Sequence, residues 1–292
     1  MKLKNLMCAS VFMVLSGAVS LAAAAPLLVL QGYADEAGAI TVLHGGNTAD
    51  PYFAMQALLL AHDNGMDISA PAERFADWLA PWQKPDGTFD RFCKDAAGRW
   101  APCNAADADD SLLAMWMRLL ETMPRKLESK PVWLKSHATS KAALEHLFQP
   151  SRGIYMVSPL VLHGLFMDNL EVWSLKVRRR PGVRAAEADK LAKAIRDTFW
   201  NPVDKHFLVS TQLEQRAEKP SFYPHQVAQI FPLLVDFPVG PDEPGSYYRA
   251  WMARHRAEWL SQGKADYPWG LLAVLAMRQG DAASARCWLR EA

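Results

Sequence analysis

Three acidic side chains cluster at one point of the chain. Asp107, Asp109 and Asp110 lie together just before an apolar run, residues 112–120, that is rich in helix formers. One aspartate is enough to cap a helix start, because its carboxylate accepts hydrogen bonds from the free amides of the first turn. Three like charges repel, so the cluster needs a ligand, a cation or a proton to compensate them. The pattern predicts a functional site, with a capped and solvated helix start as the alternative.

Other apolar helices are predicted to begin in a similar way, with polar and aromatic residues side by side. Asp50 and Pro51 form a standard helix start, a cap followed by proline at the first helical position. Residues 168–173, 223–226 and 266–270 open further helices of this type. The candidate catalytic acids are Asp107, Asp50, Asp168 and Glu171. The candidate substrate-binding residues are Asp109, Asp110, Tyr52, Trp100, Tyr155, Asn169, Trp173, Tyr223, His225 and Trp269.

Two kinds of helix alternate along the chain. The apolar helices are expected at residues 50–61, 107–120, 168–177, 223–235 and 267–277. More charged helices are expected at residues 70–83, 130–148, 183–200, 246–262 and 281–291. A helix that is buried all round is apolar along its body, whereas a peripheral helix needs only one apolar stripe. The sequence therefore predicts an all-α fold, an (α/α) toroid of five or six hairpins whose inner-helix N-termini form one mouth.

An internal repeat supports this architecture. Residues 147–158 align with residues 199–210, each segment reading as a helix end, a proline turn and a short extended piece. Each copy also leads into one of the apolar helices, so we expect the repeat to connect an outer helix to the next inner one.

Composition and the first residues bound the class of protein. Lys2 and Lys4 precede an apolar stretch and an alanine tract, which is typical of a cleavable signal peptide over residues 1–25. We expect residues 26–292 to form a single domain, located in the periplasm or secreted, with no stable membrane insertion after cleavage. The chain has 32 Lys and Arg against 31 Asp and Glu, so it lacks the basic excess of a nucleic-acid-binding protein.

Cysteine spacing predicts one disulfide. Cys93 and Cys103 bracket a short loop that leads to the aspartate cluster, and an oxidising compartment would allow them to pair. Free buried thiols are the alternative. Cys287 is expected in the core of the last helix, and no zinc-type spacing or calcium-loop motif is present, so no metal or cofactor is predicted.

These motifs together resemble the six-hairpin glycosidase group. Asp107-Ala108-Asp109 before an apolar helix resembles the Asp-Gly-Asp or Asp-Ala-Asp of family-eight glycoside hydrolases, the bacterial cellulase and endoglucanase type. The resemblance implies a catalytic Asp107 and a sugar-binding Asp109. Where that family carries its general-acid glutamate this chain has Ala49, with Asp50 beside it.

Glycoside hydrolysis needs two carboxyl groups, one protonated and one ionised. The sequence therefore favours an exported glycoside hydrolase acting on a polysaccharide or oligosaccharide, with aromatic platforms for the sugar rings.

Three alternatives remain at this stage. The absence of the glutamate at Ala49 would suit a non-catalytic saccharide-binding toroid of a polysaccharide export or biofilm system. A uronate lyase or epimerase would use Asn169, Tyr223 and His225. A terpenoid-cyclase-like protein is the third, because residues 82–89 and Asp107-Ala108-Asp109-Asp110 are similar to motifs of those toroids.

Overall fold

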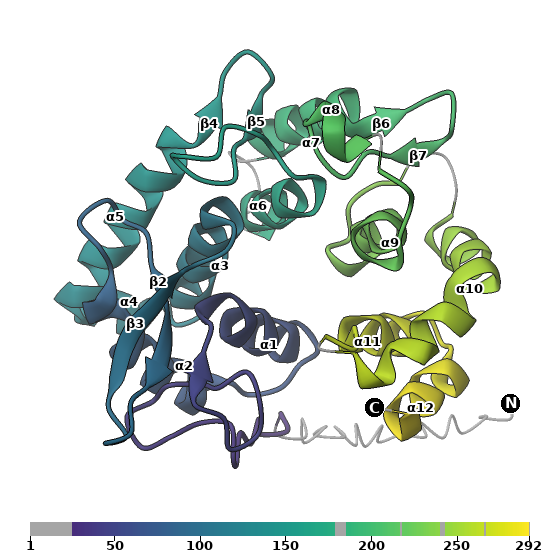
Figure 1. Ribbon diagram of the computed structural model, residues 1–292. Coiled ribbons are helices and arrows are strands. Elements are labelled where there is room, and N and C mark those ends of the chain that lie inside the picture. Colours follow the sequence, from purple (N-terminus) through teal and green to yellow (C-terminus); the bar gives the residue numbers. More distant parts are fainter. Residues whose placement is uncertain (1–24, 179–184, 217, 240–242, 266, 292) are drawn as a thin grey trace, which may run out of the picture.

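The helices of the protein are arranged in a ring (Figure 1). The structure, a computed structural model, describes residues 25–178, 185–216, 218–239, 243–265 and 267–291. Each inner helix packs against the next one along the chain. Within the described residues the inner helices are α1 (Pro51–Asp63), α3 (Asp109–Glu121), α6 (Phe166–Arg178), α9 (Val227–Leu234) and α11 (Gly270–Arg278).

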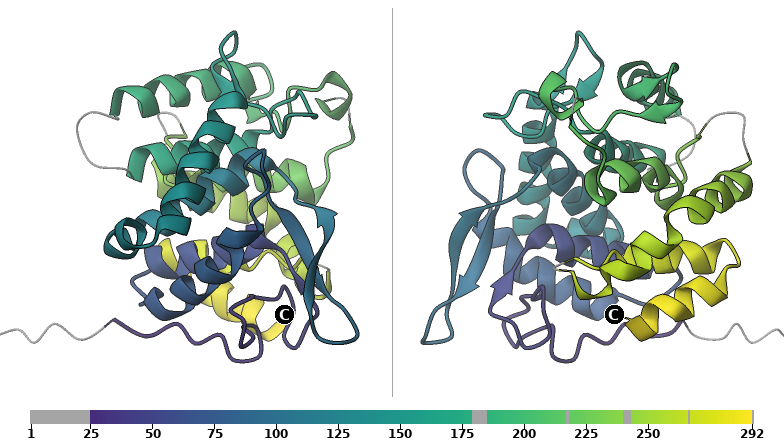
Figure 2. Two further views of the ribbon diagram at one scale, coloured as in Figure 1. Left: turned by 90° about the vertical axis from the view of Figure 1, so that its left-hand side faces the viewer. Right: turned by 45° about the vertical axis from the view of Figure 1, so that its right-hand side comes forward.

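A second set of helices lies outside this ring (Figures 1 and 2). It comprises α2 (Ser69–Leu79), α5 (Pro131–His146), α7 (Ala185–Phe199), α10 (Pro244–Ser261) and α12 (Ala282–Glu291). The connections contain two short helices, α4 (Pro124–Ser129) and α8 (Leu213–Arg216), and the single turns η1 (Ala80–Trp82), η2 (Phe222–Gln226) and η3 (Gln262–Lys264). The predicted (α/α) toroid, with five hairpins in the described part of the chain, is confirmed.

Burial explains why the two sets differ in sequence. In α3 every residue from Asp110 to Met117 is buried, and Trp116 donates a hydrogen bond from Nε1 to Ser136 Oγ on α5 at 2.9 Å. In α7 the buried residues form one stripe that includes Leu191, Ile195 and Phe199. An inner helix is enclosed by neighbours and an outer one is half in water, so only the outer set tolerates many charges.

The two repeat segments form matching hairpins. In the first, β4 (Phe148–Gln149) pairs with β5 (Ile154–Tyr155), and in the second β6 (Trp200–Asn201) pairs with β7 (His206–Phe207). Asn169 on α6 clamps the first hairpin, accepting from Tyr155 N at 2.8 Å and donating to Tyr155 O at 3.0 Å. Gln229 on α9 clamps Phe207 in the same way, at 2.8 and 2.9 Å. Each inner helix therefore fixes the hairpin that leads into it.

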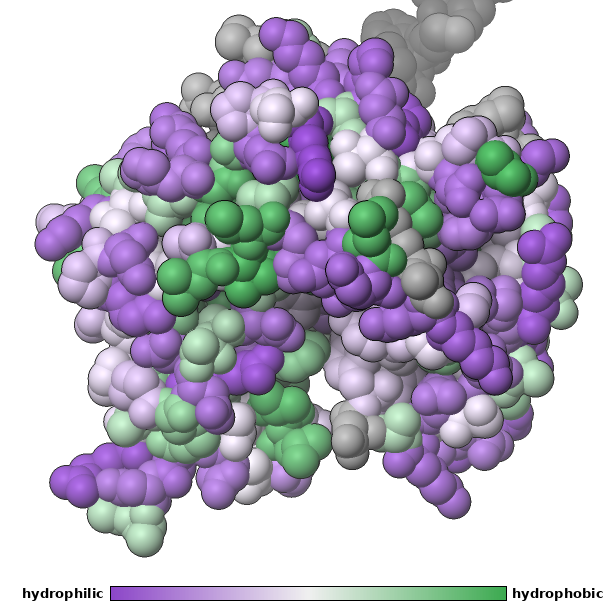
Figure 3. Space-filling model, turned by 45° about the horizontal axis from the view of Figure 1, so that its top comes forward, coloured by the Kyte–Doolittle hydropathy of each residue, from purple (hydrophilic) through white to green (hydrophobic). Residues whose placement is uncertain are grey.

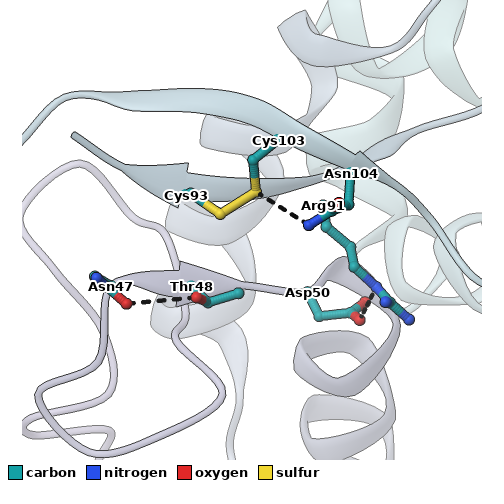
Figure 4. Close-up of a disulfide and its surroundings, with 7 residues drawn as sticks. All are labelled: Asn47, Thr48, Asp50, Arg91, Cys93, Cys103 and Asn104. Atoms are coloured by element: carbon teal, nitrogen blue, oxygen red, sulfur yellow. Dashed lines mark hydrogen bonds and ion pairs between the residues drawn. A yellow bond between two sulfur atoms is a disulfide. The ribbon is translucent and has the colours of Figure 1, made fainter.

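A three-stranded antiparallel sheet covers one side of the ring. Its order is β1 (Thr48–Ala49), β2 (Asp90–Lys94), β3 (Trp100–Ala105), with a register irregularity between Arg91 and Phe92. The sequence predicted a loop here, so the β2–β3 hairpin corrects that expectation. The predicted disulfide is confirmed: Cys93 on β2 is bonded to Cys103 on β3 (Figure 4).

The predicted signal peptide lies outside the described residues apart from Ala25. In the described part of the chain, none of the helices has the length and apolar character needed to span a membrane. The surface shown in Figure 3 mixes hydrophilic residues with scattered hydrophobic ones.

Candidate functional site

A pocket of about 300 Å³ lies where the inner helices begin. Every inner helix contributes to it, either through its first turns or through the residues just before it. The N-terminal ends therefore converge, as the toroid prediction requires. The lining residues are Asp50, Tyr52, Phe53, Gln56, Arg91, Asp107, Ala108, Leu165, Met167, Asp168, Tyr223, Phe231, Tyr267 and Trp269.

Arg91 joins two carboxylates at the edge of this pocket. Its Nε lies 2.7 Å from Asp50 Oδ2, and its Nη2 lies 3.5 Å from Asp107 Oδ2 (Figure 4 shows the Asp50 pair). Asp50 is buried and also caps α1, accepting from Tyr52 N at 3.0 Å. Burial raises the pKa of Asp50 while Arg91 opposes that change. Arg91 thus comes from the disulfide-bridged hairpin and holds one acid of the inner ring in place.

The three clustered aspartates point in three directions. Asp107 lies at the mouth with its side chain 79% exposed. Asp109 lies outside the pocket, in the electrostatic field of Lys84, Asp86 and Asp90, and burial raises its pKa to about 6. Asp110 is fully buried inside the ring, and its Oδ1 accepts from Ser111 N at 2.9 Å. Successive helical residues are rotated by about 100°, so neighbours in sequence face different surroundings.

A group of buried acids lies behind the mouth. Asp168 and Glu171 are three residues apart on α6 and share a face of that helix. Asp168, Glu171 and Asp110 each have one buried carboxyl oxygen without a hydrogen-bond partner. The other oxygen of Glu171, Oε1, accepts a hydrogen bond from Tyr52 Oη at 2.9 Å.

Burial controls the protonation of these acids. Burial and the charge of Asp107 raise the pKa of Asp168 to about 7, and burial with the charge of Asp168 raises the pKa of Glu171 to about 8. Burial, Asp168 and Glu171 raise the pKa of Asp110 well above its usual value. At neutral pH the group therefore retains protons, which a general acid requires.

Aromatic rings form a continuous wall of the pocket. Consecutive ring centroids are separated by 5.3 Å for Tyr52–Phe53, 5.2 Å for Phe53–Tyr267, 4.8 Å for Tyr267–Trp269 and 5.0 Å for Tyr223–Trp269. The rings come from α1, from the start of α11 and from η2. Partial burial and the negative charges of Asp168, Asp107 and Glu171 raise the pKa of Tyr223 to about 12, so its hydroxyl stays protonated and able to donate a hydrogen bond.

Two backbone outliers also border this pocket. Ala108 has a φ of 38° and Trp269 a φ of 55°, and each is the residue before an inner helix. The left-handed region is costly for residues with a Cβ, above all for a bulky one. Such conformations persist where surrounding packing enforces them, and they concentrate at functional sites.

Several other predicted residues lie away from the pocket. Trp100 on β3 donates from Nε1 to Asp35 Oδ2 at 2.6 Å, and Trp173 packs edge-on against Phe237 in the core. Tyr155 and Asn169 hold each other through the hairpin clamp. His225 lines a neighbouring pocket. The structure thus brings together Asp50, Asp107, Asp168, Tyr52, Tyr223 and Trp269, with Glu171 and Asp110 in the layer behind them.

The remaining lining residues were not among the predicted site residues: Phe53, Gln56, Arg91, Ala108, Leu165, Met167, Phe231 and Tyr267. Tyr267 adjoins the predicted Trp269, so the aromatic character of that helix start was the available signal. Arg91 had no such signal, because it reaches the pocket from a strand that the sequence did not reveal. Among the described residues, no group of three or more acids, histidines or cysteines is arranged to hold a metal ion.

The fold and the pocket define an α/α toroid with acids and aromatic rings at its mouth. No family model matches the chain, and no curated protein matches it by sequence. Solved structures do share the fold. A novel alpha-amylase from Clostridium perfringens is 8% identical and has a TM-score of 0.57; the alignment covers 89% of this chain and 82% of the amylase. A cold-adapted family 8 xylanase is 9% identical and has a TM-score of 0.51; the alignment covers 84% of this chain and 73% of the xylanase. An uncharacterized conserved protein from Thermus thermophilus is 12% identical and has a TM-score of 0.52; the alignment covers 90% of this chain and 88% of that protein. Identities this low establish a glycosidase-like fold and no specific family.

Proposed function

We propose that the protein is a glycoside hydrolase that cleaves a polysaccharide or oligosaccharide with two carboxyl groups. The observation that carries the proposal is the pocket itself, in which Asp107 and Asp168 share a site with a wall of aromatic rings. A pyranose ring has an apolar face, which stacks on an aromatic ring, and a rim of hydroxyls, which bonds to carboxylates. The pocket offers both kinds of surface.

Asp168 is the proposed general acid. It is buried, one of its oxygens has no partner, and its pKa of about 7 leaves a large protonated fraction at neutral pH. It would donate that proton to the glycosidic oxygen as the bond to the leaving sugar breaks.

Asp107 is the proposed second carboxylate, acting as base or nucleophile. It is the most exposed of the pocket acids, and its Oδ2 lies 3.5 Å from Arg91 Nη2. The charge of Asp107 also raises the pKa of Asp168, which favours the protonated form of Asp168. Asp50 is less suited to either role because Arg91 holds its carboxylate at 2.7 Å.

The alpha-amylase and the family 8 xylanase support the carbohydrate assignment, since both are enzymes that act on polysaccharides. A uronate lyase or epimerase receives less support, because His225 does not line this pocket and no other histidine appears among its described lining residues.

The test is a screen of the purified protein against bacterial and plant polysaccharides, scoring binding and new reducing ends separately. Asp168→Asn and Asp107→Asn should each lower the rate of reducing-end formation by about a hundredfold or more while leaving binding largely intact. Asp109→Asn is the matched control, because Asp109 neighbours the site in sequence and lies outside the pocket.

Three outcomes would revise the proposal. Binding without new reducing ends in the wild-type protein would identify a non-catalytic saccharide-binding toroid. Full activity in Asp168→Asn would remove Asp168 from the mechanism. Absence of binding to every glycan would reject the carbohydrate assignment.

We further propose that the protein is exported to the periplasm or secreted. The disulfide between Cys93 and Cys103 supports this, because such bonds persist mainly in oxidising compartments. Mass spectrometry of the protein purified from its native host should find a mature chain that begins near residue 26 and is located outside the cytoplasm.

A further inference from the structure

A second pocket, of about 180 Å³, is lined in part by η2, which also contributes to the first pocket. We call it the side pocket. Its walls come from β7 and the residues after it, from α8, and from the junction of η2 with α9. Its floor is apolar, with Phe207, Leu208, Val209 and Pro220 among the lining residues.

Two polar atoms on its walls are buried and have no hydrogen-bond partner among the described residues. They are Nε2 of His225 and Oε1 of Gln215. By contrast, Gln229 on the same wall is fully engaged in clamping Phe207. A buried polar atom without a partner is unfavourable, so a site with two of them in one pocket favours a ligand that supplies both bonds.

The chemistry of the two atoms defines that ligand. Gln215 Oε1 is an acceptor. Ser221 N donates a hydrogen bond to His225 Nδ1 at 3.2 Å, so Nδ1 is the unprotonated nitrogen of the neutral ring and Nε2 carries the proton. Nε2 is therefore a donor. A hydroxyl group both accepts and donates, so one hydroxyl can accept from His225 Nε2 and donate to Gln215 Oε1.

Two stretches of the chain connect the side pocket to the first pocket. Tyr223 lines the first pocket and His225, two residues later, lines the side pocket, so η2 forms the rim between them. Val209 lines the side pocket, and the following residue, Ser210, forms an antiparallel bridge with Leu165 of the first pocket. Tyr223 is 56% exposed, which leaves its ring available on this rim.

We propose that the side pocket is a second saccharide subsite, which takes a sugar unit of a chain whose reacting unit occupies the first pocket. The chain would cross the ring of Tyr223, place a hydroxyl between His225 and Gln215, and lay its apolar face over Phe207 and Leu208. This proposal rests on the proposed function, and it assigns to His225 a contact remote from the reacting bond.

The test is calorimetric titration with two ladders, maltose to maltohexaose and xylobiose to xylohexaose, on the Asp168→Asn protein so that no cleavage intervenes. Affinity should rise with chain length in one ladder. Gln215→Ala and His225→Ala should each reduce the affinity for the hexasaccharide about tenfold, the effect of one lost bond to a buried polar group, and leave disaccharide affinity unchanged. The imidazole NMR signals of His225 should shift with the hexasaccharide alone.

His146→Ala is the control, because His146 is exposed on α5 and bonds only to Ala142 O of its own helix at 2.8 Å. Gln215→Ala guards against misfolding, since the amide oxygen that it removes makes no bond in the protein. Equal affinity for the long and short ligands, or a hexasaccharide affinity that neither variant changes, would overturn the subsite and leave the proposed function standing. If neither ladder binds at all, both the subsite and the saccharide assignment for these glucan and xylan ligands fail.

Discussion

At the scale of single residues, the decisive property is how each acid is surrounded. Asp107, Asp109 and Asp110 have the same side chain within one short segment, yet they face solvent, an outer cluster and the interior respectively. The sequence predicted an acidic site at this point, and the pocket does contain Asp107. It could not predict the division of roles, because that depends on which neighbouring helix each carboxyl meets.

The buried acids predict an unusual pH dependence of stability. Burial raises the pKa of Glu171 to about 8, from about 4.3 in an unfolded chain. Between these values the folded state binds more protons than the unfolded state, so stability falls as pH rises. For this one group the loss is at most about 1.4 kcal/mol per pH unit.

Urea unfolding between pH 5 and about pH 9 measures this effect. Glu171→Gln keeps an acceptor for Tyr52 and removes the titration, so its free energy of unfolding should fall less steeply over that range than the wild-type value. Glu36→Gln, at an exposed position, is the control and should follow the wild type. Parallel curves for wild type and Glu171→Gln would show that Glu171 keeps an ordinary pKa.

At the scale of secondary-structure elements, prediction succeeded where burial leaves a periodic pattern. The inner helices are apolar along their bodies, and their expected ranges match α1, α3 and α6 closely. Helices α9 and α11 begin at Val227 and Gly270, later than expected, because Tyr223 has non-helical φ and ψ and Trp269 has a positive φ. The sequence of the β2–β3 hairpin has no such periodic pattern. Residues Ala101 to Ala105 of β3 are exposed and include Pro102, which suits an edge strand and gives no alternation of apolar residues. Arg91 was missed for the same reason.

The disulfide should stabilise this hairpin and, through it, the mouth. Cys93 and Cys103 are 10 residues apart, and a loop of this size contributes about 2 to 3 kcal/mol when it is closed. Replacing both cysteines by serine should lower the free energy of unfolding by about that amount. Because Arg91 lies two residues before Cys93 and holds Asp50, kcat/KM should fall as well.

Unfolding and activity measured with and without a reductant provide the check. The reductant should weaken the wild-type protein and have no effect on the double serine variant. Cys287→Ser should behave as the wild type, because Cys287 is outside the disulfide. A double variant as stable and active as the wild type would show that the bond is dispensable for the hairpin.

At the scale of the whole molecule, the ring must close between its first and last hairpins. These are far apart in sequence, so no local pattern could predict the side chains that join them. A directed chain of hydrogen bonds makes the join. Tyr267 Oη donates to Gln56 Oε1 at 3.0 Å, and Gln56 Nε2 donates to Tyr52 Oη at 3.2 Å. Tyr52 then donates to Glu171, so the chain links the start of α11 to α1 and α6.

Gln56→Leu should therefore loosen the contact between α1 and the start of α11. The substitution keeps the volume of the side chain, breaks both of its bonds and leaves the Tyr267 hydroxyl without its partner, at an expected cost of about 1 to 3 kcal/mol. Because the first and last inner helices meet here, amide hydrogen exchange should accelerate in α1 and in α11 together, while the outer helices α5 and α7 stay protected. Tyr248→Phe is the control: it breaks a 3.0 Å bond to Asp281 between α10 and α12, so its exchange should rise near Asp281 and leave α1 unchanged. Faster exchange in α1 alone after Gln56→Leu would mean that the aromatic contact between Phe53 and Tyr267 closes the ring without the hydrogen-bond chain.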